Sequence, residues 1–223
     1  SELAKVLHII NGRPMLAYSI DLASELGSEK IVAVIGHQAS MIREAFNSHR
    51  LIFVEQHEQL GTGHAVLQAK EVFRDYRGTI LILCGDVPLL KKSTLKALYD
   101  RHLETKSVVT VMTVILEDPG NYGRVVTGND GQVMKIVEQR DATEEEKKIR
   151  EINTGIYCAD CSFLFDAVGR IKNDNAQHEY YLTDIIEIAR LSGRRAGSYV
   201  ASDPIEVMGI NTPQELELAA LSM

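Results

Sequence analysis

A single carboxylate stands at the end of an apolar run in the first half of the chain. Residues 79–84 are almost all apolar or β-branched, which predicts a strand buried on both faces of a sheet. Gly85 and Asp86 end the run, and Pro88 prevents it from continuing as a central strand. Open α/β sheets bind ligands at the carboxyl ends of their strands, so Asp86 is a candidate ligand-binding group. The plain alternative is that Asp86 only caps a turn.

A second oxygen-bearing side chain, Asn211, directly follows the apolar residues 207–210, which predict another strand. At two strand ends on the same edge of a sheet, Asp86 and Asn211 would present a carboxylate and an amide oxygen to one point. Such oxygens suit a hard cation such as Mg²⁺, which keeps several waters and bridges to phosphate oxygens. Together, Asp86 and Asn211 could hold such a cation.

A glycine-rich turn lies between a predicted strand at 51–54 and a helical pattern that begins at Thr62. Gly61 and Gly63 would let the backbone approach a ligand closely, and Thr62 would cap the helix. Free N–H groups at such a turn suit a phosphate or the hydrogen-bonding edge of a base. The spacing matches neither the dinucleotide fingerprint nor a Walker loop, and a tight turn without a ligand is the alternative.

Two polar residues of the second half could grip sugar hydroxyls. Glu138 ends a predicted hairpin strand, and Asn153 lies within a strand although its side chain prefers turns and caps. Ordinary surface polarity is the alternative for each of them. His37, His64 and His178 lack the spacing of metal ligands, so we interpret them as structural or peripheral.

The three cysteines indicate a reducing compartment, so we expect a cytoplasmic protein. Cys158 and Cys161 have the spacing of a metal or redox pair. A zinc site would need a second pair, which the sequence lacks, and a thioredoxin-like pair would stand at a helix start after the first strand. We interpret both cysteines as incidental.

Composition excludes two classes of partner. The chain of 223 residues has a formal net charge of −7 and no basic stripe, which argues against nucleic acid and membrane surfaces. No apolar run approaches the roughly 20 residues that span a bilayer. The length suits one large domain, and residues 1–223 show no linker and no repeat.

Apolar runs alternate with amphipathic stretches in the first half, whereas the second half contains a hairpin signal. This order predicts an α/β fold of Rossmann-like type, with a mostly parallel central sheet, helices on both faces and a small antiparallel β lobe. The expected strands are 31–35, 51–54, 79–84, 108–115, 124–127, 132–137, 152–157, 198–201 and 207–210. The expected helices begin at Pro14, Ser40, Thr62, Ser93 (as a cap), Asp141 (a charged helix to Arg150), Ser162, Thr183 and Pro213.

Taken in order, these segments resemble the N-acetylglucosamine-1-phosphate uridyltransferase domain of the bifunctional bacterial enzyme, within the sugar-phosphate nucleotidyltransferase family. The match extends over nearly the whole chain and is specific as a set, although single segments would fit related nucleotidyltransferases. The matching segments are KVLH (5–8), EQLGTGHA (58–65), GDVPL (85–89), GNYGR (120–124), VE (137–138), DA (141–142), EINTG (151–155), EYYLTD (179–184) and GIN (209–211).

The resemblance implies a Mg²⁺-dependent transfer. The phosphate of N-acetylglucosamine 1-phosphate would attack the α-phosphorus of UTP in line, forming UDP-N-acetylglucosamine and releasing pyrophosphate. Such a transfer depends on positioning and charge neutralisation, so it needs no protein nucleophile. The implied roles are catalysis for Lys5 and Asp86, with Lys5 on phosphate; metal binding for Asp86 and Asn211; nucleotide binding for Gln56, Gly61 and Thr62; and sugar binding for Gly123, Glu138, Asn153, Tyr181 and Thr183.

The sequence departs from the family pattern at both ends. The family begins with a strand and a glycine-rich loop that cradles the triphosphate, whereas this sequence starts at Ser1, just past that loop. It also stops before the acetyltransferase domain of the bifunctional enzyme. We expect a piece of a longer protein, and whether it forms a homo-oligomer stays open. The alternatives are transfer to another sugar, such as glucose 1-phosphate with UTP or dTTP, and a silent domain that binds nucleotide sugars.

Overall fold

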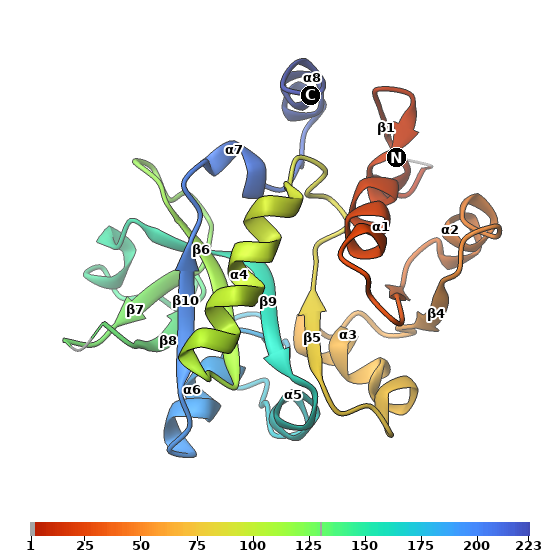
Figure 1. Ribbon diagram of the computed structural model, residues 1–223. Helices are drawn as coiled ribbons and strands as arrows, with labels where there is room; N and C mark the ends of the chain where they lie inside the picture. Colours follow the sequence, from red (N-terminus) through yellow and green to blue (C-terminus); the bar gives the residue numbers. More distant parts are fainter. Residues whose placement is uncertain (1–2, 130) are drawn as a thin grey trace.

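The strands form three sheets in the computed structural model, which describes residues 3–129 and 131–223 (Figure 1). β1 and β2 form a short antiparallel pair, β3 and β4 form a parallel pair, and six further strands form the main sheet. The strands are β1 (Ile9–Ile10), β2 (Arg13–Pro14), β3 (Val32–Ile35), β4 (Ile52–Glu55), β5 (Thr79–Ile82), β6 (Val109–Ile115), β7 (Arg124–Thr127), β8 (Val133–Val137), β9 (Glu151–Asp160) and β10 (Ala196–Val200). The α-helices are α1 (Met15–Glu25), α2 (Ala39–Ala45), α3 (Thr62–Gln68), α4 (Lys92–Thr105), α5 (Cys161–Val168), α6 (Asp184–Leu191), α7 (Pro204–Val207) and α8 (Pro213–Leu221). Short 3₁₀ helices are η1 (Lys5–Leu7), η2 (Lys70–Phe73) and η3 (Glu146–Lys148).

β9 is the central strand of the main sheet. The order is β10-β6-β9-β7-β8, and β5 also pairs with β9. Because β5, β6 and β7 each pair antiparallel with β9, while β10 runs parallel to β6, four strands share one direction. The α/β prediction is confirmed, and the sheet is mixed because β9 and β8 run against the others.

Helices cover both faces of this sheet, as predicted. Leu95 and Leu98 of α4 are fully buried against Met112 and Val114 of β6 (Figure 1). On the opposite face, α5 and α6 pack against the alternate residues of the same strand, Val111 among them. Burial on both faces explains why the strand reads as a continuous apolar run.

Along one side of β9, the neighbouring strand changes from β7 to β5 at residues 153–155. Residues Tyr157–Asp160 pair with β5, whereas Ile152 pairs with β7. Between them, Gly155 adopts φ +79° and the register with β6 shifts. Such a bulge bends a strand and re-aims its side chains. Asn153 therefore lies where β5 and β7 separate, which explains a turn-preferring residue in mid-strand.

The segment after the hairpin differs from the prediction. Residues 141–150 contain only the 3₁₀ turn η3, because Thr143 and Glu146 bond to each other locally and the lysines pair with nearby glutamates. A helix here would have almost no apolar face to bury. The predicted hairpin itself forms as β7 and β8, with Gly128 N–H donating to Gln132 O; Asp130 of its turn lies outside the described residues.

Two further details correct the sequence analysis. Residues 207–210 are not a strand: Val207 ends α7, which Asp203 caps, and the backbone then runs on extended. A short apolar run cannot distinguish a strand from a helix end. Ser93 lies inside α4, whose N-cap is Lys91 without a side-chain bond.

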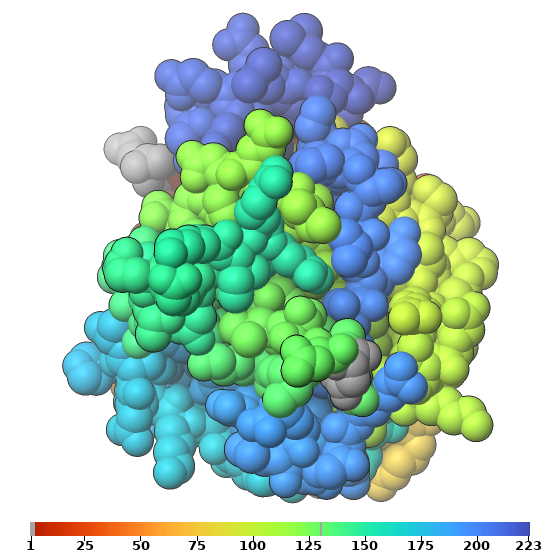
Figure 2. All heavy atoms as spheres, turned by 90° about the vertical axis from the view of Figure 1, so that its left-hand side faces the viewer, coloured from red at the N-terminus to blue at the C-terminus, as the bar shows by residue number. Residues whose placement is uncertain are grey.

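α8 begins at Pro213, as predicted, with a capping box formed by Thr212 and Glu215. In Figure 2 this helix projects above the face made by the hairpin and the segment leading into β9. In the described chain, no helix is both long and apolar enough to cross a bilayer.

Candidate active site

A lysine brings together the two residues predicted to hold a metal. Lys5 Nζ donates to Asp86 Oδ2 (2.5 Å) and to Asn211 Oδ1 (2.8 Å). Ile210 N–H donates to the backbone oxygen of Asp86, which ties the two segments together. Asn211 Nδ2 donates to Gly209 O, so the amide is oriented with Oδ1 toward Lys5. Asp86 and Asn211 thus converge on one cationic point.

The capping box of α8 also fixes Asn211. The Asn211 N–H donates to Glu215 Oε2 (2.6 Å), and this bond lowers the pKa of Glu215. Asn211 was predicted at a strand end, but an extended segment before a capped helix holds it instead. The placement beside Asp86 is the one predicted.

This oxygen pair fits a divalent cation. Both side-chain oxygens lie within 2.8 Å of Lys5 Nζ, so they already contact one cation. Both are also hard oxygen ligands of the kind that Mg²⁺ takes. The described residues contain no group of three or more His, Cys, Asp or Glu that could hold a metal. Substrate oxygens and water would therefore have to complete the coordination, as is usual for Mg²⁺.

The glycine turn is built differently from the prediction. Gln56 Nε2 donates to Gly61 O (3.1 Å), so these two predicted nucleotide-binding residues do meet. Thr62 does not cap α3; the N-cap is Gly61, and Thr62 Oγ1 accepts from Leu182 N–H. Gly63 N–H donates to Tyr180 O (2.7 Å) and is not free for a ligand.

The backbone of Tyr180 explains both glycines. A Cβ on Gly61 would lie 2.7 Å from Tyr180 O, and one on Gly63 would lie 2.9 Å from the same oxygen. Tyr180 N–H also donates to Leu60 O (2.8 Å). The two glycines therefore allow residues 179–182 of the same chain to pack closely against the turn. The turn predicted to bind nucleotide is thereby joined to the segment predicted to bind sugar.

The predicted sugar-binding residues gather where β5 and β7 separate along β9, a place that we call the fork in β9. Thr183 Oγ1 donates to Glu138 Oε1 (3.3 Å), and Asn153 N–H donates to Gly123 O (2.9 Å). Gly123 packs beside the Glu138 carboxylate, since a Cβ there would lie 3.1 Å from Ile136 Cγ2 and 3.4 Å from both carboxylate oxygens. Burial raises the pKa of Glu138, against the opposing effect of the Thr183 bond.

Asn153 faces inward with its oxygen and leaves its amide nitrogen unused. Its Oδ1 accepts from Gly155 N–H (2.9 Å) and from the buried Tyr157 hydroxyl (3.0 Å). Its Nδ2 has no acceptor among the described residues and remains available to a ligand. Tyr181 is less available, because its hydroxyl donates to Asp141 and accepts from Gln177.

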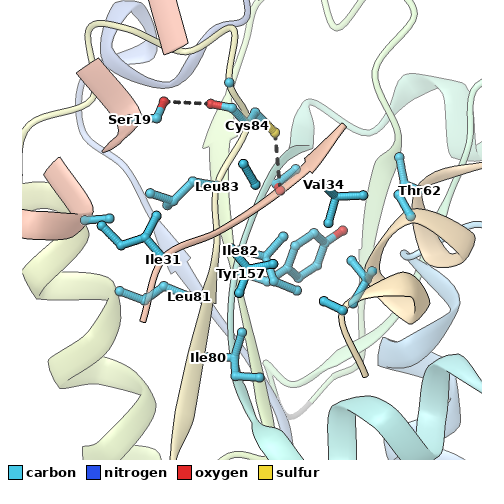
Figure 3. Close-up of a pocket in the computed structure, with 18 of the residues that line it drawn as sticks. Ser19, Ile31, Val34, Thr62, Ile80, Leu81, Ile82, Leu83, Cys84 and Tyr157 are labelled. Carbon is cyan, nitrogen blue, oxygen red and sulfur yellow. Dashed lines mark hydrogen bonds between the residues drawn. The ribbon is translucent and has the colours of Figure 1, made fainter. Parts of the chain in front are cut away.

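A cleft of about 980 Å³ reaches part of this set of residues (Figure 3). Its apolar part lies between β3 and β5, where Val34, Ile80 and Ile82 point inward. Cys84 also lines the cleft, and its carbonyl oxygen accepts from the Ser19 hydroxyl. Burial raises the pKa of the Cys84 thiol to about 12. The predicted site residues that line this one cleft are Lys5, Thr62, Glu138, Asn153 and Thr183.

Comparison with known proteins identifies the family. The family model described as "Nucleotidyl transferase" matches residues 2–204. The chain belongs to the nucleotidyl transferase family. The chain spans about half the length of the curated relatives it matches. It is 50% identical over 217 residues to "Bifunctional protein GlmU" of Geobacter metallireducens, covering 97% of this chain and 46% of that protein.

A second relative of this nucleotidyl transferase is "Bifunctional protein GlmU" of Desulfotalea psychrophila, 47% identical over 219 residues, with 98% of this chain and 65% of that protein covered. Among solved structures, a UDP-glucose pyrophosphorylase in complex with UDP-glucose superposes with a TM-score of 0.75 at 16% identity. It covers 98% of this chain and 89% of that one. At that identity the likeness concerns the fold alone, and it supports the predicted α/β class.

The sequence assigned no site role to two ionisable groups that lie beside predicted site residues of this nucleotidyl transferase. Asp184 follows Thr183, and burial raises its pKa to about 6 with help from Glu187, Glu138 and Asp141. His64, interpreted as structural or peripheral, lies with Nδ1 3.0 Å from Gln56 Nε2. No local sequence pattern identifies either group, because the residues that bury them and bond to them come from other segments of the chain. Cys158 and Cys161 are buried in two different apolar clusters.

Proposed function

We propose that the protein joins UTP and N-acetylglucosamine 1-phosphate to form UDP-N-acetylglucosamine and pyrophosphate. The observation that carries the proposal is that Lys5, which bonds to both Asp86 and Asn211, lines a cleft that also reaches Glu138 and Asn153. Identities of 45–50% to proteins named GlmU, together with the motif resemblance, support the same reaction.

In the proposed reaction, a phosphate oxygen of the sugar phosphate attacks the α-phosphorus of UTP, and the bond to the β-phosphate oxygen breaks. Pyrophosphate leaves with the electron pair of that bond. Lys5 would turn from Asp86 to a phosphate oxygen and neutralise its charge. Gln56, Gly61 and Thr62 would hold the uridine, so the chain contributes mainly alignment.

Asp86 and Asn211 would hold the Mg²⁺. When bound, the ion would supply charge neutralisation on the phosphate oxygens. Asp86→Ala should then abolish pyrophosphate release and leave the fold in place. Release at near the wild-type rate would remove Asp86 from the metal site.

The sugar would lie at the fork in β9. Glu138 and the free Nδ2 of Asn153 offer an acceptor and a donor for hydroxyl or acetamido groups, and Gly123 leaves room beside them. Thr183 would orient the Glu138 carboxylate through its hydrogen bond. Tyr181 would hold the segment after β8 in place through its hydrogen bond to Asp141. These roles belong to the proposal.

We also propose that the longer natural protein places a strand in the apolar part of the cleft. Within the described chain, β3 pairs only with β4 and β5 only with β9, and every residue of β3 and β5 lines the cleft. One extended apolar segment from upstream of Ser1, with the glycine-rich loop after it, would satisfy both edges. The chain extended upstream should have a higher melting temperature than the 223-residue chain; an unchanged melting temperature would refute the strand.

A cytoplasmic location also stays a prediction.

A pyrophosphate-release assay tests the function. The full-length protein is offered UTP, CTP and dTTP with N-acetylglucosamine 1-phosphate and glucose 1-phosphate, with and without Mg²⁺. We expect the highest rate for UTP with N-acetylglucosamine 1-phosphate and a loss of activity without Mg²⁺. A preference for glucose 1-phosphate would favour the alternative transferase. Binding without any turnover would favour a silent binding domain.

A further inference from the structure

His64 lies between two glutamines at the start of α3. Its Nδ1 is 3.0 Å from Gln56 Nε2, and its Nε2 is 3.0 Å from Gln68 Nε2. Each glutamine nitrogen also donates to a carbonyl: Gln56 to Gly61 O (3.1 Å) and Gln68 to His64 O (3.0 Å). The ring of Tyr180 packs near the imidazole, with centroids 6.3 Å apart.

The two ring contacts are not equivalent. A neutral imidazole donates from one nitrogen and accepts at the other, so it can accept from only one of the two amide groups. Both amide nitrogens have a carbonyl acceptor, so burial is what separates the two glutamines. Gln56 is 9% exposed, and its bond to Gly61 O holds that amide with its nitrogen toward the ring. Gln68 is only half-buried on the helix surface, so it can give up its bond to His64 O and turn its oxygen to the ring. The proton therefore belongs on His64 Nε2, and Nδ1 accepts from Gln56.

We propose that His64 is a positioning residue that presents the oxygen of Gln56 to the pyrimidine base. With Nδ1 as an acceptor, both N–H groups of Gln56 are engaged, by His64 and by Gly61 O. Oε1 is then the one polar atom of that amide without a donor in the described chain. Because no buried side-chain oxygen of the described residues lacks a partner, Oε1 reaches solvent as an open acceptor. This inference deepens the proposed function and rests on it, since it requires that Gln56 meets the base.

An outward acceptor selects for a donor on the base. Uracil presents N3–H between two carbonyl oxygens, whereas cytosine presents an unprotonated N3. The N–H groups of Gly61 and Thr62 have no acceptor in the described chain, so either can donate to a uracil carbonyl beside Gln56 Oε1. Against cytosine, Oε1 would meet a lone pair. A Gln56 amide turned the other way would reverse this preference.

The tautomer can be measured directly in the wild-type protein. Long-range ¹H–¹⁵N correlation spectra at about pH 8 distinguish the two neutral tautomers of a histidine. We expect the Nε2–H tautomer for His64. The Nδ1–H tautomer would overturn the proposal, because that proton would point at Gln56 Nε2. This measurement needs no variant and is independent of whether any substitution disturbs folding.

Base discrimination provides the second test, using calorimetric affinities of the full-length protein for UTP and CTP. His64→Leu should lower the UTP-over-CTP affinity ratio about tenfold, the scale of one misplaced hydrogen bond. His64→Asn, whose Oδ1 can replace the Nδ1 acceptor, should restore most of the ratio. Gln68→Leu removes the other ring contact and should leave the ratio unchanged.

The outcomes separate the two proposals. A ratio unchanged in His64→Leu, or lowered equally in His64→Leu and His64→Asn, would overturn the role of His64 alone. Wild-type protein that binds CTP as tightly as UTP would instead overturn the proposed nucleotide.

Discussion

The ammonium nitrogen of Lys5 lies 2.5 Å from Asp86 Oδ2, at the point on which Asn211 Oδ1 also converges. One cation therefore already compensates the carboxylate that we propose as a metal ligand. Lys5 and a divalent ion would compete for the same two oxygens until a phosphate draws Lys5 away. On the proposed function, the site would exchange one positive charge for another as substrate arrives.

This competition predicts opposite effects of Lys5→Met on binding and on turnover. Without nucleotide, affinity for Mn²⁺ should rise roughly threefold to fivefold, the equivalent of one partly exposed ion pair. Turnover should fall, because the phosphate loses its ammonium partner. Electron paramagnetic resonance titration measures the first effect and pyrophosphate release the second.

Lys148→Met is the matched control, since Lys148 pairs with Glu145 on an exposed turn away from the site. It should change neither quantity. Weaker Mn²⁺ binding in Lys5→Met would show that Lys5 supports the metal rather than competing with it.

Asn153→Asp is predicted to weaken binding of the sugar phosphate more than binding of UTP. The Asp variant keeps an acceptor for Gly155 N–H and the Tyr157 hydroxyl, but it loses the free Nδ2 and adds a negative charge. Asn153→Ala is less informative, because it leaves the fully buried Tyr157 hydroxyl unpaired at a cost of about 1–3 kcal/mol. Isothermal titration should show roughly a tenfold loss for N-acetylglucosamine 1-phosphate.

Folding must stay intact for that comparison, so the melting temperature of Asn153→Asp should remain within about 2 °C of wild type. If the variant loses more affinity for UTP than for the sugar phosphate, the sugar does not lie at the fork in β9.

Local signals in the sequence were sufficient for most elements. Pro14 caps the start of α1, close to the predicted start, and Gly27 follows its end with the left-handed φ of +78° typical of a helix-terminating glycine. The apolar run before Gly85 does form a strand, β5, but its residues are only partly buried because they line the cleft. Each of these features depends on residues within a few positions of one another.

Long-range contacts are where the sequence was insufficient. Asn211 was expected at a strand end, yet residues 207–210 divide between α7 and an extended segment, because four apolar residues fit either state. The glycines at 61 and 63 suggested a ligand, whereas Tyr180, far along the chain, is the group they accommodate. Glycine spacing shows that something approaches closely but not what approaches.

Gly61→Ala should therefore destabilise the protein by about 3 kcal/mol or more. Gly61 has φ +107°, and a Cβ there would lie 2.7 Å from Tyr180 O and 2.8 Å from Tyr180 N. Gly12→Ala is the control: φ is +80° but nothing lies within 4 Å, so only backbone strain of about 1–2 kcal/mol is expected. Urea unfolding measures both. Equal losses would mean that Tyr180 moves aside freely and does not couple the turn to the sugar segment.

The stability of the protein should depend on pH through Asp184, whose pKa is raised from 3.8 to about 6, chiefly by burial. Below about pH 4 the carboxyl is protonated in both states, and the folded form bears no cost. Between about pH 4 and pH 6 only the folded state holds the proton, so stability falls as the pH rises. Above that range the full cost of an ionised, half-buried carboxylate remains.

Asp184→Asn should remove this cost. At about pH 8 the variant should be more stable by about 1 kcal/mol, a rise in melting temperature of roughly 2–4 °C, after allowance for solvent screening and for the lost attraction to the start of α6. Near pH 4 the difference should vanish, since both proteins are then neutral at this position. Asp166→Asn, on the exposed side of α5, is the control and should show no such trend. A stabilisation equal at both pH values would mean that the Asn side chain packs better and that the ionisation of Asp184 is not the cause.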